Sequence, residues 1–246
     1  MAGRRAVSNL LALAVLVALT ERPMHPYEMA ATMRSQGKER SIKLNYGSLY
    51  SVVEALQRHG LIEAQETRRE GRRPERTVYA VTDAGRAEFE DWLAELLSTP
   101  THEPSSLEAA LSLAAGLSPD EVARLLQERC VRLELQLRAT QAGVDMSREQ
   151  GLPDLFLVET LFAVAMLQAE LDFVRALAGD IRSGAFPGTK AWRRMHELLE
   201  SGLTFDEVRA DLATYLGDEE GAWLALDERQ PSPRDEAAPP KGGTKT

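Results

Sequence analysis

Apolar residues recur along the first third of the chain with the period of a helix. Residues 8–20 are apolar nearly all round, which predicts a first helix that several other elements cover, with Ser8 as its N-cap. Pro23 prevents this helix from continuing. A short second helix is expected from Pro26, at a first-turn position, to about residue 35.

A third helix and a hairpin follow, because the period of the pattern changes from about 3.6 to about 2 residues after Gly60. The third helix is predicted from its N-cap Asn45 to about residue 59, with apolar positions at helical spacing: Leu49, Val52, Val53 and Leu56. Residues 61–67 and 76–81 alternate as two strands around a polar loop. Thr82 caps a fourth helix that reaches about residue 97. This element order is that of a winged helix-turn-helix.

The rest of the chain is predicted to be helical. Helices are expected at residues 107–115, 118–142, 155–178, 190–201 and 205–215. The predicted domains are a winged helix-turn-helix at 1–97, a linker at 98–106, a helical domain at 107–230 and a disordered tail at 231–246. The fold class is therefore mostly α, with an N-terminal winged helix-turn-helix that carries a two-stranded β wing, followed by an all-α C-terminal dimerisation domain.

The charge is distributed unequally between the two predicted domains. The chain carries 29 Lys and Arg against 38 Asp and Glu, a net charge of -9. Residues 1–86 hold 14 Lys and Arg against 9 Asp and Glu, whereas the remaining residues hold 15 against 29. A positive surplus on the first domain suits a face that binds phosphates, and the acidic second domain would be kept away from nucleic acid.

Cysteine usage and the first residues bear on the cellular compartment. The single cysteine, Cys130, excludes an internal disulfide and fits a reducing cytoplasm. Arg4 and Arg5 with the apolar run after them imitate a secretory signal, but a run of about ten residues is too short to span a bilayer. No small-residue cleavage site follows this run. We therefore expect a cytoplasmic protein without a membrane segment.

The winged order indicates where DNA would be contacted. The third helix of such a domain enters the major groove, and the hairpin tip reaches neighbouring phosphates. The start of the third helix offers short polar and aromatic groups, and the hairpin offers arginines for phosphates or the minor groove. The predicted contacts are Lys43, Asn45, Tyr46, Ser48, Tyr50 and Ser51 at the helix, and Arg68, Arg69, Arg72, Arg73 and Arg76 at the hairpin. Two alternatives stay open: the arginines form a merely solvated turn, or the domain is a protein-binding adaptor without direct DNA contact.

Several motifs resemble the signature of PadR-type transcriptional regulators. They are His25-Pro26-Tyr27-Glu28, Tyr46-Gly47-Ser48-Leu49-Tyr50 with Leu56, His59-Gly60-Leu61-Ile62, Tyr79, and Thr82-Asp83-Ala84-Gly85-Arg86. The resemblance covers residues 8–97 and, more loosely, 105–185. It implies that Tyr27 and Tyr50 join the wing arginines in holding the DNA backbone. Ser51 departs from the family, which usually has proline after this tyrosine.

The C-terminal helices favour a homodimer. Residues 155–177 are too apolar for a lone surface helix, and the preceding long helix has a stripe that needs a partner: Val122, Leu126, Arg129, Leu133 and Leu137. A second copy is expected because operator half-sites match a two-fold symmetric protein, and the family resemblance implies the same arrangement. The alternative is that these helices bury each other within one chain.

The predicted function is a sequence-specific transcriptional regulator, a repressor released from double-stranded operator DNA by a small effector. Similar proteins commonly sense small aromatic compounds, and the candidate pocket residues are Phe89, Trp92 and Met166, although apolar helix residues are more often plain core. We expect no cofactor, metal or catalysis. The chain lacks a phosphate-binding loop and a nucleophile motif, and its four histidines, at positions 25, 59, 102 and 196, lack ligand spacing.

Overall fold

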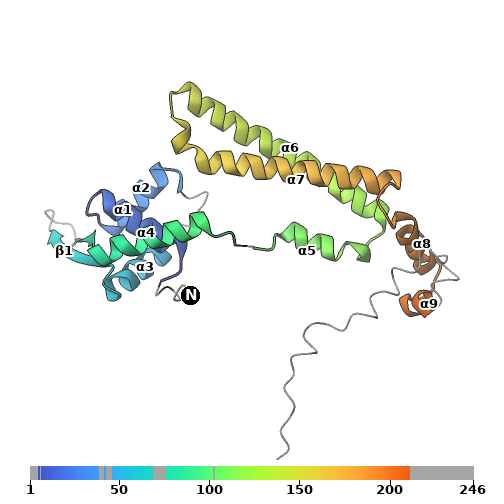
Figure 1. Ribbon diagram of the computed structural model, residues 1–246, viewed down its shortest axis with the longest axis horizontal. Coiled ribbons are helices and arrows are strands. Elements are labelled where there is room, and N and C mark those ends of the chain that lie inside the picture. The colour runs from blue at the N-terminus through green and yellow to red at the C-terminus, as the bar shows by residue number, and fades with distance from the viewer. Residues whose placement is uncertain are drawn as a thin grey trace, which may run out of the picture. The chain divides into compact units, whose positions relative to one another are not determined.

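The computed structural model describes residues 5, 7–38, 42, 46–68, 76–101 and 103–210, and the chain divides into two compact units, residues 1–103 and 104–246. The first unit contains α1 (Leu10–Glu21), α2 (Pro26–Ser35), α3 (Tyr46–Arg58), β1 (Ile62–Arg68), β2 (Arg76–Val81) and α4 (Asp83–Ser98) (Figure 1). This is the predicted winged helix-turn-helix order. The predicted linker lies between the end of α4 and the start of the next helix.

α1 forms the centre of the first unit's core. Its buried residues cover most of the helix surface, as its all-round apolar sequence predicts: Leu11, Ala12, Leu13, Val15, Leu16, Ala18 and Leu19. α2, α3 and α4 pack around it and contribute Met29, Leu56 and Trp92 to the same cluster. The N-cap is Asn9 and not Ser8, because the side-chain oxygen of Asn9 accepts a hydrogen bond from the backbone N–H of Leu11 at 2.9 Å.

The second unit is helical throughout its described part. Its elements are α5 (Ser106–Ser112), the short 3-10 helix η2 (Ala114–Gly116), α6 (Pro119–Glu149), η3 (Asp154–Phe156), α7 (Val158–Ser183), α8 (Thr189–Glu200) and α9 (Phe205–Ala210). α6 and α7 are long and lie side by side (Figure 1). The end of the predicted 205–215 helix and the predicted disordered tail at 231–246 lie outside the described residues.

α6 and α7 bury one apolar face of each against the other. The shared cluster includes Val122, Leu126, Cys130 and Leu133 of α6 and Leu171, Val174, Ala178 and Ile181 of α7. The stripe on α6 that we expected to face a second copy is therefore occupied by α7 of the same chain. For this stripe, the within-chain alternative is correct.

Both long helices extend beyond their predicted ends. α6 continues to Glu149 through Gly143, and α7 continues to Ser183 through Gly179. An isolated glycine inside a helix costs only about 1 kcal/mol, which the packing between the two helices outweighs. α7 ends at Gly184, which adopts a left-handed conformation with φ of 77°.

Polar contacts set the register of the α6–α7 pair. Arg129 donates to Glu170 at 2.7 Å, and Arg175 donates to Glu134 at 2.7 Å. Because each pair joins a position on one helix to a position on the other, sliding one helix along its neighbour would break both. The contacts also place Arg129, which the sequence assigned to the dimer stripe, in an ion pair within the chain.

α8 is part of the second unit and not a separate appendage. Its Trp192 indole N–H donates to the carbonyl of Leu117 at 3.0 Å, and its Arg193 donates to Asp120 at 2.8 Å. The Nε2 atom of His196 lies 3.0 Å from the carbonyl oxygen of Ala115. α8 thus satisfies carbonyl groups in the connection that leads from α5 into α6.

Candidate nucleic-acid interface

The buried face of α3 is the one that the sequence predicts. Leu49, Val52, Val53 and Leu56 are all buried in the core of the first unit. The opposite side of the helix is open to solvent, and Tyr50 is 46% exposed there. The amphipathic pattern therefore orients the start of α3 so that its polar groups remain accessible.

Ser51 lies in the second turn of α3, where its hydroxyl donates a hydrogen bond to the carbonyl of Gly47 at 3.1 Å. The hydroxyl hydrogen is used inside the helix, so the free capacity of this oxygen is that of an acceptor. Ser48, one turn earlier, is half-buried. Of these two predicted contact residues, Ser51 is the more accessible.

The exposed side of α3 also carries a residue that sequence reasoning missed. Glu54 is exposed and follows Tyr50 and Ser51 by one helical turn. A carboxylate is repelled by phosphates but accepts a hydrogen bond from the amino group of cytosine. The sequence could have indicated Glu54, because it lies four residues after Tyr50 and residues three or four apart share a helix face.

Several predicted contact residues lie outside the described part of the chain. Lys43, Asn45, Arg69, Arg72 and Arg73 belong to this group. Of Tyr46, Arg68 and Arg76, the structure describes the backbone only. The roles of these eight residues stay predictions.

The backbone of the wing places two arginines opposite each other. β1 and β2 pair antiparallel, with Ile62 opposite Val81 at one end and Arg68 opposite Arg76 at the other. A bulge between Ala64 and Glu66 shifts the register between these ends.

The base of the wing is joined to the segment before α2. Met24 and Tyr79 exchange two backbone hydrogen bonds, each 3.0 Å long, so that Met24 extends the two-stranded sheet beyond β2. Tyr79 is half-buried and packs against the core. These bonds connect the wing directly to the helices of the first unit.

The N-terminus of α2 has a reciprocal cap. The ring Nδ1 of His25 accepts a hydrogen bond from the backbone N–H of Tyr27 at 3.1 Å, and the Glu28 carboxylate accepts one from the backbone N–H of His25 at 2.9 Å. The side chain of Tyr27 is 57% exposed at the first turn of this helix. The cap fixes the start of α2 and with it the position from which Tyr27 projects.

Two of the three predicted effector residues lie in the core of the first unit. Trp92 is only 5% exposed, and Phe89 is partly buried against the same cluster. Arg5 covers the Trp92 ring at 5.4 Å from its centroid. Met166 belongs to the second unit and is exposed, so a pocket that joins all three residues stays a prediction.

Arg5 is a further residue that sequence reasoning missed. Its guanidinium donates to Glu88 at 2.7 Å and to Asp91 at 2.9 Å, and it also bonds Glu95. Burial by itself lowers the pKa of Arg5. The hydrogen bonds to the three acids together raise this pKa by more than burial lowers it, so the net shift is upward. The spacing of the three acids by three and four residues was the signal, because it places them on one face of α4.

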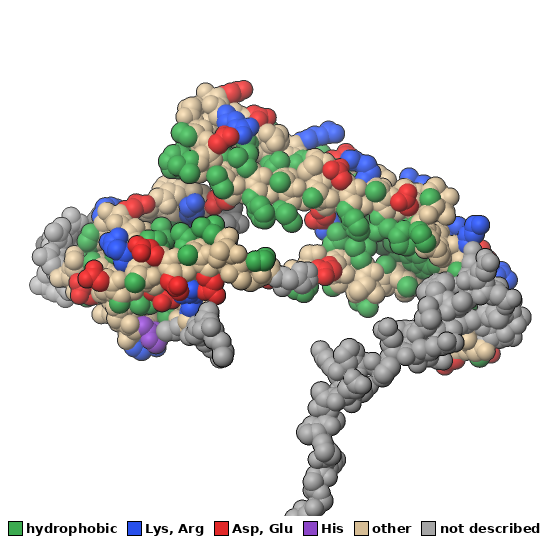
Figure 2. All heavy atoms as spheres, in the orientation of Figure 1, with side chains coloured by type: hydrophobic (Ala, Val, Ile, Leu, Met, Phe, Trp, Pro, Cys, Tyr) green, Lys and Arg blue, Asp and Glu red, His purple; other side chains and the backbone are tan. Residues whose placement is uncertain are grey.

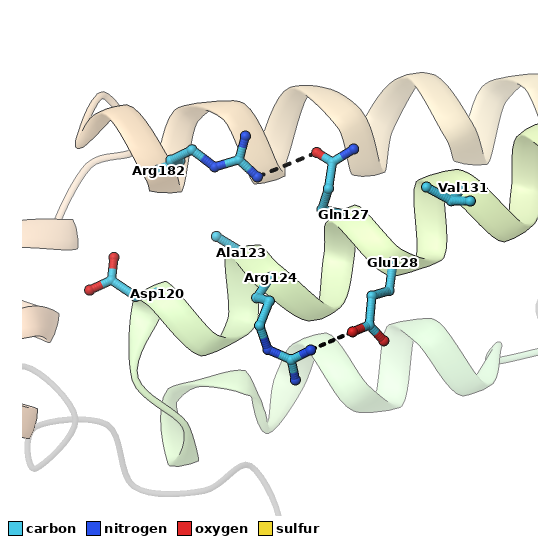
Figure 3. Close-up of a pocket in the computed structure, with 7 residues that line it drawn as sticks. All are labelled: Asp120, Ala123, Arg124, Gln127, Glu128, Val131 and Arg182. Atoms are coloured by element: carbon cyan, nitrogen blue, oxygen red, sulfur yellow. Dashed lines mark hydrogen bonds and ion pairs between the residues drawn. The ribbon is translucent and has the colours of Figure 1, made fainter.

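A groove of about 430 Å³ opens along the first half of α6 (Figure 3). Its lining residues are Asp120, Ala123, Arg124, Gln127, Glu128, Val131 and Arg182. The charged groups are paired locally: Arg124 bonds Glu121 and Glu128, and Arg182 donates to Gln127 at 3.4 Å. The hydrogen bond from Arg193 also holds the pKa of Asp120 below its ordinary value. Phe89, Trp92 and Met166 do not line this groove.

Within the described ranges, none of the helices is both long enough and apolar enough to cross a membrane.

Part of the chain is similar to known transcriptional regulators. Residues 15–91 match the family described as the Transcriptional regulator PadR-like family. The probable transcriptional regulator Rv1176c of Mycobacterium tuberculosis is 29% identical over 133 residues, which are 49% of this chain and 67% of that relative.

Solved structures share the fold. Bacillus subtilis PadR in complex with operator DNA matches with a TM-score of 0.56 and 18% identity, over 70% of this chain and 99% of that one. The same protein in complex with p-coumaric acid matches with a TM-score of 0.57 and 16% identity, over 71% and 99%. The predicted mostly helical fold with a winged helix-turn-helix is thereby confirmed.

The matched family is described as one of transcriptional regulators. Residues 15–91, which contain the motifs quoted from the sequence, are thus similar to the PadR-like family of transcriptional regulators.

Proposed function

We propose that this protein is a homodimeric repressor that binds operator DNA in the cytoplasm and is released by a small aromatic effector. The observation that carries the proposal is that the open side of α3 and the arginine-bearing wing belong to one compact unit, joined by the hydrogen bonds between Met24 and Tyr79. Such a connection holds α3 and the wing at a fixed distance and orientation. Both elements can then contact a rigid DNA duplex at the same time.

The wing supplies the attraction to phosphates. Arg68 and Arg76 stand opposite each other in the strand register, and three further arginines occur in the seven residues between the strands, at positions 69, 72 and 73. Five guanidinium groups around one turn would displace counterions from the duplex. This contact holds the protein on DNA but does not select a sequence.

α3 supplies the groups that select a sequence. Ser51 presents an acceptor oxygen, and Glu54 presents a carboxylate on the same open side. Acceptors of this kind pair with the amino groups of adenine and cytosine in the major groove. Tyr50 and Tyr27, both exposed, would donate their hydroxyls to phosphate oxygens.

The relatives support the operator and the effector as partner classes. Bacillus subtilis PadR, which shares the fold, has been crystallised with operator DNA and with p-coumaric acid. In this chain, Phe89, Trp92 and Met166 remain the candidate effector contacts. A planar aromatic acid is thus the first class of compound to test.

A binding titration tests the proposal. The full chain is titrated against its own upstream region at several salt concentrations, and we expect a specific complex that weakens steeply as salt rises. Replacing Arg72 and Arg73 with Ala should lower affinity for all DNA sequences and reduce the salt slope by about 2, since each phosphate contact contributes close to 1. Sedimentation and thermal unfolding should be unchanged.

The matched control is the double variant Arg132→Ala and Arg138→Ala, which removes the same charge from exposed positions of α6. It should bind DNA like the parent chain. Equal affinity of the wing variant and the parent would show that the wing assignment is wrong. Failure of every variant and of the parent to bind DNA would favour the protein-binding adaptor instead.

A reporter measurement tests repression. Transcription from the bound promoter should rise when the gene for this chain is deleted, and a fall would identify an activator. Adding p-coumaric acid to the purified complex probes release, and a panel of other aromatic acids extends the probe. Affinity unaffected by the whole panel would exclude this class of effector.

A further inference from the structure

An acidic side chain, that of Glu54, stands on the open side of α3. Tyr50 and Ser51 lie one turn before it on this side and Arg58 lies one turn after it, and all of them are exposed. A spacing of four residues often allows an acid and a base to pair on a helix. Within the ranges that the structure describes, however, the Glu54 carboxylate has no ion pair or hydrogen bond, with Arg58 or with any other residue. It is therefore accessible to a molecule that approaches this side of α3.

A carboxylate in this place opposes DNA binding unless the DNA offers it a hydrogen-bond donor. The third helix of a winged helix-turn-helix enters the major groove, which is bordered by negatively charged phosphates. The first unit is otherwise suited to a polyanion, because residues 1–86 hold 14 Lys and Arg against 9 Asp and Glu. The donors that base edges present in the major groove are the amino groups of adenine and cytosine. A favourable partner of Glu54 must be one of these two groups.

The chemistry of a carboxylate favours cytosine over adenine. An ionised carboxylate accepts hydrogen bonds at both of its oxygens and donates none. Adenine presents the acceptor N7 beside its amino group, so the second carboxylate oxygen would face N7 and be repelled by it. Cytosine presents its amino group without an acceptor of its own in the groove. Guanine and thymine present acceptors and no donor there, so they repel the carboxylate as well.

We infer that Glu54 is a specificity-determining residue of α3 and that it selects a cytosine at one position of each operator half-site. This inference rests on the proposed function, which supplies the DNA and the pairing of two copies. Glu54 lies about 6 Å along the helix from Tyr50, at 1.5 Å per residue. A phosphate contact of Tyr50 would hold the helix at the edge of the groove while the carboxylate reaches a base. Ser51 discriminates less, because its single acceptor oxygen suits the amino group of either adenine or cytosine.

A binding selection tests this role. The full chain is incubated with a pool of DNA duplexes of random sequence, and the bound duplexes are recovered and sequenced. The same selection is carried out with Glu54→Ala and with Glu54→Gln, which has the same shape without the charge. Thermal unfolding of both variants should match that of the parent, since the side chain is exposed.

Glu90→Ala is the matched control, because it removes the same charge from an exposed position of α4. Figure 2 shows acidic side chains gathered over α4 in the first unit. The acids of this helix are Asp83, Glu88, Glu90, Asp91 and Glu95. Phosphates would avoid such a face, so Glu90→Ala should select the same sequence as the parent.

We expect the sequence that the parent selects to contain an invariant cytosine. Glu54→Ala should accept any base at this position, whereas Glu54→Gln should prefer adenine, whose N6 and N7 atoms match an amide. In the parent's selected duplex, exchange of this C·G pair for T·A should weaken binding by the parent about 10-fold or more. The same exchange should change binding by Glu54→Ala by about 2-fold at most.

Affinity for unrelated DNA separates base recognition from a merely structural role. Glu54→Ala should bind duplexes of unrelated sequence more tightly than the parent, because it removes a charge that repels phosphates. A structural role would instead weaken binding to every sequence. Weaker binding of this kind would overturn the inference.

Two further outcomes distinguish this inference from the proposed function. If the parent selects a sequence that both Glu54 variants select unchanged, or one without an invariant cytosine, DNA recognition stands and only the role of Glu54 is overturned. If the parent enriches no sequence at all, the proposed function fails and the inference fails with it.

Discussion

A β-carbon on Gly85 would stand only 1.9 Å from the carbonyl oxygen of Leu61. The same glycine donates its backbone N–H to the hydroxyl of Thr82 at 3.0 Å, and that hydroxyl donates to the carbonyl of Gly60 at 2.7 Å. The start of α4 is thus closed against the turn between α3 and β1. A glycine is required at position 85 by this close approach and not by an unusual backbone conformation.

Replacing Gly85 with Ala should destabilise the first unit by about 3 kcal/mol, because a backbone carbonyl cannot move aside as a flexible side chain does. Thermal unfolding of the full chain measures the effect. Gly143→Ala is the matched control, since a β-carbon there meets no atom within 4 Å. That change should leave stability equal or raise it by up to about 1 kcal/mol. A neutral Gly85→Ala would contradict the packing of α4 described here.

Arg5→Ala should lower the stability of the first unit by about 2 kcal/mol, because it leaves three neighbouring carboxylates without their cation and uncovers Trp92. The stability of Arg5→Lys should lie between that of the parent and that of Arg5→Ala. An ammonium group keeps the charge but lacks the planar guanidinium that reaches several acids and stacks on the indole. Thermal unfolding at low and high salt measures both variants. Unfolding temperatures that match the parent would show that the N-terminal contact is not stabilising.

Trp192→Phe should cost about 1 kcal/mol, since it removes the indole N–H that donates to Leu117 but keeps an aromatic ring in place. Amide hydrogen exchange of residues 113–118 should become faster, while exchange in the middle of α6 stays unchanged. Unaltered exchange in the 113–118 segment would show that α8 does not hold the connection between α5 and α6.

Asp120→Asn gives a pH-dependent effect. The hydrogen bond from Arg193 lowers the pKa of Asp120 below its ordinary value of 3.8. A carboxyl group whose pKa is lower in the folded state adds stability above the unfolded pKa, and this contribution is lost as the pH falls through the folded pKa. The variant should therefore be less stable than the parent at pH 7, by at most about 1 kcal/mol at this exposed site.

The difference in stability between the parent and Asp120→Asn should shrink as the pH falls below 3.8. Thermal unfolding of both proteins at pH 7 and in acid measures this difference. Asp180→Asn removes the same charge from an exposed position of α7 and controls for the loss of one negative charge at pH 7. If Asp120→Asn remains less stable than the parent in strong acid, the loss of the ion pair with Arg193 is not the cause of the lower stability.

Much of the first unit could be predicted because its signals are local. The apolar spacing of α3 requires only residues within two turns of one another, and the period change after Gly60 marks the wing in the same way. The capping residue of α1 was missed by one position, since Ser8 and Asn9 are both good caps and only the backbone path distinguishes them. Likewise, Gly179 is a plausible helix end in sequence, but packing against α6 carries α7 past it.

The sequence by itself determined the order of helices and wing, the buried face of α3 and the family motifs, because each depends on neighbours along the chain. Only the tertiary structure decided that Met24 joins the wing to the helices, that Arg5 covers Trp92, and that the inner stripe of α6 is occupied by α7. These pairings connect residues dozens of positions apart. Hydrophobic periodicity indicates that a helix face is buried. Which element packs against that face depends on how the elements fit together in three dimensions.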